Sequence, residues 1–257
     1  MCLLAIALEV HSDYPLVLIG NRDEFHDRPA DPAHWWRAPR ILAGRDRQGG
    51  GGWLGVSRDG AVATVTNYRE PEAGRAGAPS RGGLVVDALG RDPSLFTEQL
   101  VRSASTFNGF NLLWGAPEAF YYLNNRGRQR PERLTAGVYG LSNGVLDTPW
   151  PKLLRARRAL ERELAREGGP SEHRLFDILA DRHEPPLEEL PDTGIDPDWE
   201  RLLSTAFICD PVYGTRASTV IMIRRDGLVT FRERAFDPSG RSVSERLFRF
   251  CRTSAGS

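Results

Sequence analysis

Segments with strand-like composition and segments with helical spacing fall into separate groups along the chain, and this grouping constrains the fold most. Strands are predicted at residues 3–10, 16–20, 53–57, 61–67, 110–114, 120–123, 137–141, 207–209, 218–223 and 228–234. Helices are predicted at residues 81–89, 93–103, 151–167 and 171–182. Parallel sheets need strands that alternate one by one with helices, whereas grouped strands favour antiparallel pairing. We therefore predict an α+β fold with mostly antiparallel sheets.

The remaining stretches define the expected domain. Residues 21–52 are rich in Pro, Asp, Arg and Gly, which predicts a mainly loop-like segment. The tail at residues 253–257 is small and polar, which predicts disorder. Because the chain shows no internal repeat and no long linker, residues 1–252 are predicted to form a single domain.

Charge and cysteine content exclude several classes of protein. The 34 basic side chains balance 34 acidic ones, whereas nucleic-acid binding favours a basic excess. No apolar run approaches the roughly 20 residues of a membrane span, and residues 2–8 lack the features of a signal peptide. We therefore expect a cytoplasmic protein without nucleic-acid partners or integral membrane association. Three cysteines form no disulfide framework, and no ligand spacing specifies a metal. Nothing in the sequence indicates the oligomeric state.

Cys2 is the first candidate for chemistry. Removal of Met1 would leave a cysteine that carries both a thiol and a free α-amine at the start of a predicted strand. The ordinary pKa of an α-amine is about 7.7–8.0 and that of a thiol about 8.5. One residue can therefore supply a nucleophile and its base, as in N-terminal-nucleophile enzymes. The alternative is a small apolar side chain that begins a strand.

The run Asn21-Arg22-Asp23-Glu24 follows the second predicted strand directly. A short turn joins this strand to the first one, so antiparallel pairing brings the run back to Cys2. A carboxylate there could hold an ammonium group, and an arginine could lower the pKa of the thiol. The alternative is a solvated charge cluster at the end of a strand.

Three further polar residues lie next to predicted strands: Asn67, Asn143 and Arg216. An asparagine amide can donate a hydrogen bond to a developing oxyanion, and an arginine can anchor a carboxylate. Taken singly, such residues are also common in turns.

Several spaced motifs occur together in one order. They are Asn21-Arg22-Asp23-Glu24-Phe25 with Arg28-Pro29, Thr66-Asn67-Tyr68-Arg69, Ser80-Arg81-Gly82, Leu141-Ser142-Asn143 with Pro149-Trp150-Pro151-Lys152, and Tyr213-Gly214-Thr215-Arg216 with Ser218-Thr219. From Cys2 to about Phe236 the chain thereby resembles the NRDE family, the transport and Golgi organisation protein 2 homologues. That family is similar to cysteine N-terminal-nucleophile hydrolases such as penicillin V acylase, bile salt hydrolase and acid ceramidase. The resemblance implies a four-layer αββα sandwich.

The resemblance also implies roles for single residues. Cys2 matches the nucleophile, Asn143 an oxyanion-hole asparagine, and Asn67 the place of a second polar donor. Arg216 matches an arginine near the nucleophile.

The sequence departs from the hydrolase pattern at Arg22 and Asp23. The hydrolases place an arginine about three residues before the catalytic aspartate, whereas here the two residues are adjacent. Neighbouring side chains on an extended strand point to opposite faces. We expect Asp23 to lie near Cys2 and Arg22 to point away from it.

Two functional hypotheses follow. In the first, the protein is an amidohydrolase that acts on a small non-peptide linear amide and requires no cofactor. In the second, the same cleft binds haem or another hydrophobic ligand for trafficking, as the resemblance to the family suggests. Ligand contacts are expected from Arg22, Glu24, Tyr68, Trp35, Trp36 and Lys152, and haem contacts from His26 and His34. Trp35 and Trp36 could equally anchor a long loop in the core.

Lys152 is the only lysine among the 34 basic residues. An arginine-rich composition is typical of a GC-rich genome, but Lys152 lies inside a motif that follows Asn143. We therefore predict that Lys152 fixes the Asn143 loop or lines the cleft, where an arginine would fit differently.

Overall fold

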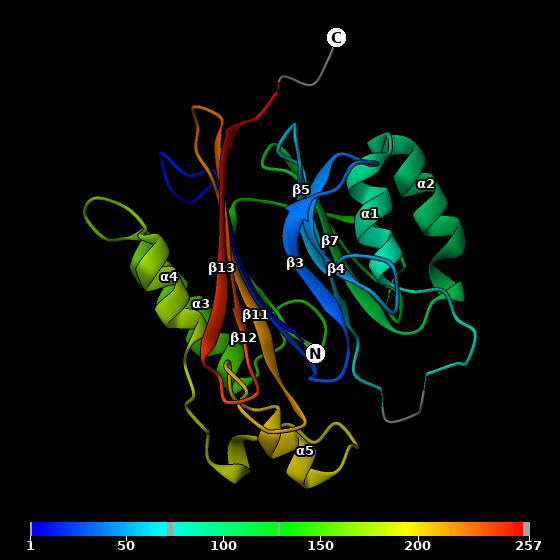
Figure 1. The fold of residues 1–257 in the computed structure, drawn as a ribbon, viewed down its shortest axis with the longest axis vertical. Coiled ribbons are helices and arrows are strands. Elements are labelled where there is room, and N and C mark those ends of the chain that lie inside the picture. The colour runs from blue at the N-terminus through cyan, green and yellow to red at the C-terminus, as the bar shows by residue number, and fades with distance from the viewer. Residues whose placement is uncertain (1, 71–73, 128, 254–257) are drawn as a thin grey trace.

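Two antiparallel sheets stacked face to face form the centre of the computed structural model, which describes residues 2–70, 74–127 and 129–253 (Figure 1). The first sheet contains, in spatial order, β10 (Gly137–Leu141), β1 (Cys2–Leu8), β2 (Leu16–Phe25), β11 (Tyr213–Ile223), β12 (Leu228–Phe236) and β13 (Ser242–Cys251). The second contains β3 (Ala30–Trp35), β4 (Ile41–Asp46), β5 (Leu54–Ser57), β6 (Val62–Asn67), β7 (Phe110–Ala116), β8 (Ala119–Asn124) and β9 (Glu132–Leu134). Neighbouring strands pair antiparallel throughout both sheets.

Helices cover the outer face of each sheet (Figure 1). The second sheet carries α1 (Gly82–Gly90) and, beside it, α2 (Pro93–Ser103), which a 3₁₀ turn (Ala104–Thr106) extends. The first sheet carries α3 (Pro151–Leu164) and α4 (Glu172–Leu179). A second 3₁₀ turn (Leu187–Glu189) and α5 (Pro197–Leu202) lie in the connection from α4 to β11. The layers are therefore helix, sheet, sheet and helix, which confirms the expected αββα sandwich.

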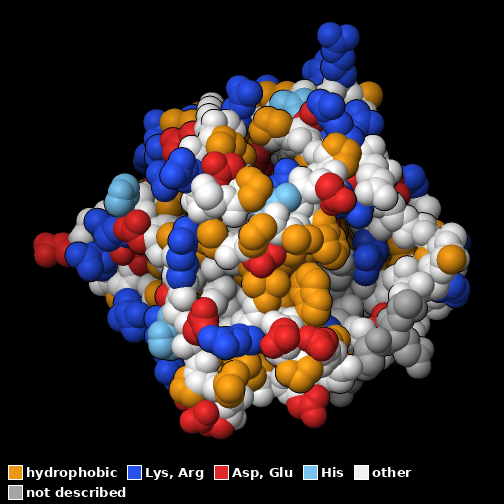
Figure 2. Space-filling view, turned by 60° about the horizontal axis from the view of Figure 1, so that its bottom comes forward, with side chains coloured by type: hydrophobic (Ala, Val, Ile, Leu, Met, Phe, Trp, Pro, Cys, Tyr) orange, Lys and Arg blue, Asp and Glu red, His pale blue; other side chains and the backbone are white. Residues whose placement is uncertain are grey.

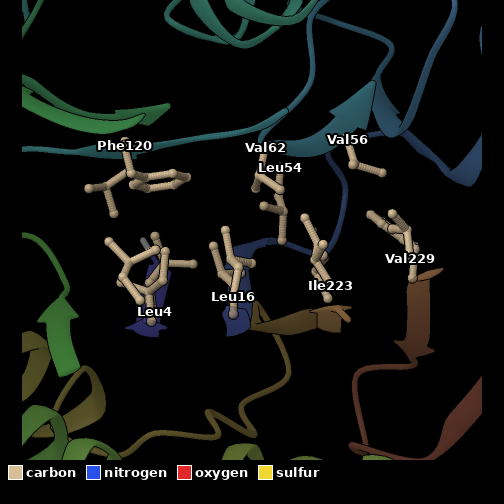
Figure 3. Packing of buried hydrophobic residues seen from close by; sticks show 14 of the residues in the cluster. Leu4, Leu16, Leu54, Val56, Val62, Phe120, Ile223 and Val229 are labelled. Carbon is tan, nitrogen blue, oxygen red and sulfur yellow. The ribbon is translucent and has the colours of Figure 1, made fainter. Parts of the chain in front are cut away.

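The first sheet buries apolar side chains on both of its faces. Along β1, Leu4 and Ile6 point into the space between the sheets, whereas Ala5 and Ala7 face α3 and α4. Both faces are buried, so the strand reads as a continuous apolar run rather than an alternating one. Leu4 of β1 and Leu16 of β2 face Phe120 and other apolar side chains of the second sheet (Figure 3). Full burial of one such side chain stabilises the fold by about 1.5–3 kcal/mol.

The structure corrects several sequence predictions. The segment 21–52 is not mainly loop, because β2 continues to Phe25 and is followed by β3 and β4. The predicted strand at 207–209 is absent, the helix predicted to reach residue 182 ends at Leu179, and β13 had not been predicted. Pro, Asp and Arg interrupt the apolar residues of β3 and β4, and β13 is mostly exposed and carries charged side chains, so none of the three has the local pattern of a half-buried strand. Apart from Thr253, the predicted tail at 253–257 lies outside the described residues.

Within residues 2–70, 74–127 and 129–253, none of the helices combines the length and the apolar character that crossing a lipid bilayer demands.

Glu233 is a buried carboxyl group between the two sheets. Its Oε1 accepts a hydrogen bond of 2.7 Å from the main-chain N–H of Ala33, and only 2% of the residue is exposed. Burial raises the pKa of Glu233 from 4.5 to about 7. The folded protein therefore binds this proton more tightly than the unfolded chain does, and the contribution of Glu233 to stability falls as pH rises from about 4.5 to about 7.

Glu233→Gln is expected to remove this pH dependence, since glutamine keeps the oxygen that accepts from Ala33. Between pH 4.5 and pH 8 the free energy of unfolding of the unmodified protein should fall by about 3 kcal/mol relative to that of the variant. Urea unfolding at several pH values measures this difference. Glu188→Gln, at an exposed position, is the control and should leave the slope intact. Parallel curves for the unmodified protein and Glu233→Gln would contradict the assignment.

Candidate functional site

Cys2 lies where three strands of the first sheet meet. It is the first residue of β1 and pairs with Arg22 of β2, and Asp23 pairs with Thr215 of β11. The hairpin of β1 and β2 thus brings the polar run back to Cys2, as the sequence predicts. Ser142, after β10, donates a hydrogen bond of 3.0 Å from its Oγ to the carbonyl oxygen of Cys2.

Cys2 lines a cleft of about 480 Å³ between the two sheets. The first sheet contributes the end of β2, and the second contributes the ends of β4 and β6 and the loops next to them. The lining side chains include Cys2, Arg22, Asp23, Glu24, Phe25, Arg28, Asp46, Trp53, Asn67, Ser80 and Arg81. Most of these side chains are polar or charged, so the cleft suits a ligand with polar groups.

The carboxylate of Asp23 is buried beside Cys2. Its Oδ1 accepts a hydrogen bond of 2.7 Å from Thr215 Oγ1, and the residue is 1% exposed. Burial raises the pKa of Asp23. Burial also raises the pKa of the Cys2 thiol, the charge of Asp23 adds to that increase, and the Asp23 main-chain N–H opposes it. Burial and the charge of its acidic neighbour together thus raise the pKa of the thiol.

Arg22 leaves the sheet on the side of the second sheet. Its Nη2 lies 3.4 Å from Asp46 Oδ2 and 3.8 Å from Glu24 Oε2, and its guanidinium stacks 4.6 Å from the centre of the Trp53 ring. Arg22 and Asp23 thus have separate partners, as strand alternation requires. Both nevertheless border the cleft that contains Cys2.

Asn67 and Asn143 lie at different distances from the cleft. Asn67 lines the cleft at the end of β6. Asn143 is fully buried, and its Nδ2 donates to the carbonyl oxygen of Asn67 at 2.7 Å. Asn143 therefore supports the segment that presents Asn67 to the cleft.

The rim of the cleft is partly apolar. Phe25 lines the cleft, is 43% exposed, and packs edge to face with Tyr213 and Trp199, with ring centres 5.1 and 6.1 Å away. Figure 2 shows hydrophobic side chains gathered in the middle of the lower face of the molecule, with charged side chains around them. A ligand in the cleft can therefore meet charged groups inside and an aromatic side chain at the mouth.

A sequence model of the family "Transport and Golgi organisation 2" matches residues 1–238. The chain belongs to the TANGO2 family. The Transport and Golgi organization protein 2 homolog of Bos taurus is 37% identical over 263 residues, which cover 92% of this chain and 93% of the bovine one. The homolog of Homo sapiens is 36% identical over 241 residues, 86% of this chain and 87% of the human one.

Two solved structures are also similar to this TANGO2-family chain. The Caenorhabditis elegans ortholog of N-acylethanolamine-hydrolyzing acid amidase matches with a TM-score of 0.43 and 12% identity, over 86% of this chain and 92% of that one. Anbu from Hyphomicrobium matches with a TM-score of 0.37 and 10% identity, over 96% of this chain and 87% of that one.

Arg216 of the TANGO2-family chain is not among the side chains that line the cleft. Its Nη1 donates to the carbonyl oxygens of Phe25, His26 and Arg28, at 2.9, 3.1 and 3.2 Å. A bulge between Thr215 and Ala217 interrupts the pairing of β11 with β2 at this point. The expectation of an arginine beside the nucleophile is therefore corrected: Arg216 fixes the turn after β2, which carries Phe25 and Arg28 to the cleft.

The predicted aromatic ligand contacts are packing residues. Trp36 is buried in the cluster between the second sheet and its helices, and its Nε1 donates to the Ala43 carbonyl oxygen at 3.0 Å. Trp35 packs against Phe250 of β13. Neither they nor Tyr68 line the cleft, because Trp35 at the end of β3 and Trp36 directly after it enter apolar clusters. The interpretation as core anchors is the one that matches their positions.

The two histidines also lie outside the lining of the cleft. His26 Nε2 is 2.9 Å from the carbonyl oxygen of Asp210, and His34 Nδ1 is 2.9 Å from that of Pro32. Both rings are therefore held by main-chain carbonyl oxygens.

Lys152 lies behind the cleft, in the first turn of α3. Its Nζ donates to the carbonyl oxygen of Leu203 at 2.6 Å. Burial lowers the pKa of Lys152 to about 8, and the charge of Asp23 opposes this decrease. Lys152 thus contacts the connection after α5 rather than the ligand space.

Five side chains of the site were not among the predicted site residues: Arg28 from the turn after β2, Asp46 and Trp53 from β4 and the residue before β5, and Ser80 and Arg81 from the loop before α1. The glycines around them were the available signal. A Cβ on Gly44 would lie 2.1 Å from the Trp53 ring, and one on Gly51 would lie 2.2 Å from the carbonyl carbon of Gly82. The run of glycines at 49–52 therefore allows the loop after β4 to pack directly against the start of α1.

Proposed function

We propose that this protein is an N-terminal-cysteine amidohydrolase that acts on a small non-peptide linear amide. One observation carries the proposal: Cys2, at the first position of β1, opens into a polar cleft next to the buried carboxylate of Asp23. The chemistry requires that Met1, which lies outside the described residues, is removed so that Cys2 gains a free α-amine.

Acylation is the first half of the reaction. The α-amine of Cys2 takes the thiol proton, and Sγ attacks the amide carbonyl carbon to form a C–S bond. The side-chain amide of Asn67 donates to the oxyanion, and Asn143, which is buried behind the cleft rather than in its lining as the oxyanion assignment expected, holds Asn67 in place through its Nδ2. The C–N bond then breaks, the α-ammonium returns its proton to the leaving nitrogen, and a thioester and a free amine remain.

Deacylation reverses these roles with water. The α-amine takes a proton from water, and the hydroxide attacks the thioester carbon. The C–S bond breaks, the proton goes to the thiolate, and a carboxylic acid leaves. The carboxylate of Asp23 stabilises the α-ammonium that forms in both halves.

The charged lining favours a polar substrate over haem as the occupant of the cleft. A small amide fits within about 480 Å³, and small-molecule sites are commonly about 300–1,000 Å³. The haem hypothesis relied on His26 and His34, which are held by the carbonyl oxygens of Asp210 and Pro32.

Intact-mass spectrometry tests the first requirement of the proposal. The purified protein is expected to lack the mass of one methionine residue, because aminopeptidases remove Met1 when the next side chain is small. A protein with Met1 retained would have no free amine on Cys2 and would overturn the mechanism. A variant with Cys2→Leu, whose larger second residue should retain Met1, is the matched control for the mass assignment.

A further inference from the structure

We propose that Glu200 of α5 is a positioning residue that holds Asn67 and Asn143 in place through Arg69. This inference rests on the proposed function, because it assigns Asn67, supported by Asn143, to the oxyanion that forms at Cys2. Glu200 is not among the residues that line the cleft, so its effect must pass through its contacts.

Glu200 and Arg69 form a buried ion pair. Arg69 Nη1 lies 2.5 Å from Glu200 Oε2, and their side chains are 5% and 8% exposed. The other carboxylate oxygen accepts hydrogen bonds from the main-chain N–H of Thr193, at 3.1 Å, and from its hydroxyl group. The carboxylate is therefore fixed on one side by the connection before α5 and on the other by Arg69.

Arg69 is joined to Asn143 directly and to Asn67 through Asn143. Its main-chain N–H donates to the carbonyl oxygen of Asn143 at 2.7 Å, and Asn143 Nδ2 donates to the carbonyl oxygen of Asn67, also at 2.7 Å. The guanidinium of Arg69 additionally stacks 4.7 Å from the centre of the Trp150 ring. The side chain of Arg69 is thus fixed, and its main chain sets the distance between the segment that carries Asn67 and the segment that carries Asn143.

The same network extends to the nucleophile. Thr66 Oγ1 donates to the carbonyl oxygen of Ser142 at 2.8 Å, and Ser142 Oγ donates to that of Cys2 at 3.0 Å. Oxyanion donors lose their effect when they move by a fraction of an ångström. A contact that fixes Arg69 therefore also fixes the position of Asn67 relative to the Cys2 thiol.

Stability alone does not explain a buried ion pair at this place. A pair of apolar side chains of similar volume often stabilises a fold as well as a buried ion pair does. The pair does supply something apolar contacts lack, since a planar guanidinium held by a carboxylate has one defined orientation. We infer that orientation is what Glu200 provides.

Two reactions of Cys2 separate positioning from a general structural effect. Acylation by p-nitrophenyl acetate forms an oxyanion, whereas alkylation by iodoacetamide does not. In Glu200→Gln, the rate of acylation is expected to fall about 10-fold or more, since loss of an oxyanion donor costs roughly 100- to 1,000-fold. The rate of alkylation should stay within about twofold of that of the unmodified protein. Burst kinetics and intact mass measure both rates.

A second variant controls for misfolding, because Glu200→Gln leaves the guanidinium of Arg69 buried without its carboxylate partner. Arg69→Met combined with Glu200→Leu removes both charges and should fold, yet acylate as slowly as Glu200→Gln. Glu184→Gln is the control, since it removes an exposed carboxylate that pairs with Arg201 of α5. It should change neither rate.

Each outcome decides a separate point. Acylation of both Glu200 variants at the unmodified rate, or an equal fall in acylation and alkylation, would overturn the positioning role while leaving the proposed function intact. Absence of acylation at Cys2 in the unmodified protein would overturn the proposed function, and this inference with it.

Discussion

Cys2→Ala is expected to abolish acylation of the protein by p-nitrophenyl acetate. The loss should be at least about 1,000-fold, because removal of a nucleophile leaves only the slow background reaction. Alanine is small enough that Met1 should still be removed, so the variant differs in the thiol alone. The burst of p-nitrophenolate and the mass of the acylated protein measure the effect.

The other two cysteines provide the control for this result. Cys209 and Cys251 are exposed, and Cys209→Ser with Cys251→Ser should keep the full burst. Acylation that survives in Cys2→Ala and disappears in the double serine variant would show that the reactive thiol lies elsewhere. That result would remove the basis of the hydrolase proposal.

Asp23→Asn is expected to change acylation and alkylation in opposite directions. The carboxylate raises the pKa of the Cys2 thiol, so its neutralisation should lower that pKa and increase the rate of alkylation by iodoacetamide at pH 7. Acylation should nevertheless fall by about 10- to 100-fold, because the α-ammonium loses the charge that stabilises and orients it. Rates measured from pH 6 to pH 9 separate the two effects.

Glu24→Gln is the matched control for Asp23→Asn. It removes one negative charge from the same cleft, but its carboxylate lies near Arg22 and Arg28. It should leave the alkylation rate close to that of the unmodified protein. A fall of both rates in Asp23→Asn would indicate a damaged site instead of a lost ammonium partner.

The parts of the fold that were predicted correctly are those whose local pattern reflects burial. The hairpin of β1 and β2 and that of β5 and β6 show apolar runs joined by short turns, and α3 shows its apolar stripe after Pro151. β3, β4 and β13 were missed because polar, charged, Pro or Gly residues interrupt their apolar pattern. In β13, for example, Glu245 pairs with Arg232 and Arg234 of β12, and such pairs leave no periodic apolar signal.

Some residues of the candidate site could likewise be predicted from local patterns, and others could not. Cys2, Asp23 and Asn67 could be predicted because each lies at an end of a recognisable strand, next to a neighbour that the hairpins define. Arg81 and Asp46 could not, since the stacking of the second sheet on the first brings them to the cleft. Trp35 and Trp36 illustrate the converse: aromatic residues in a Pro-rich segment resemble a ligand wall until β3 assigns them to the core.

The burial of Lys152 makes the chain unusual in its surface chemistry. Because it is the only lysine in 257 residues and its ammonium lies against the carbonyl oxygen of Leu203, the folded protein offers amine-directed reagents no accessible side-chain amine. Conjugation with an N-hydroxysuccinimide ester would thus attach at most one label per chain, at the terminal α-amine. A lysine-specific protease likewise has one peptide bond to cut, in the first turn of α3, and its cleavage rate would report how often that helix opens from the sheet.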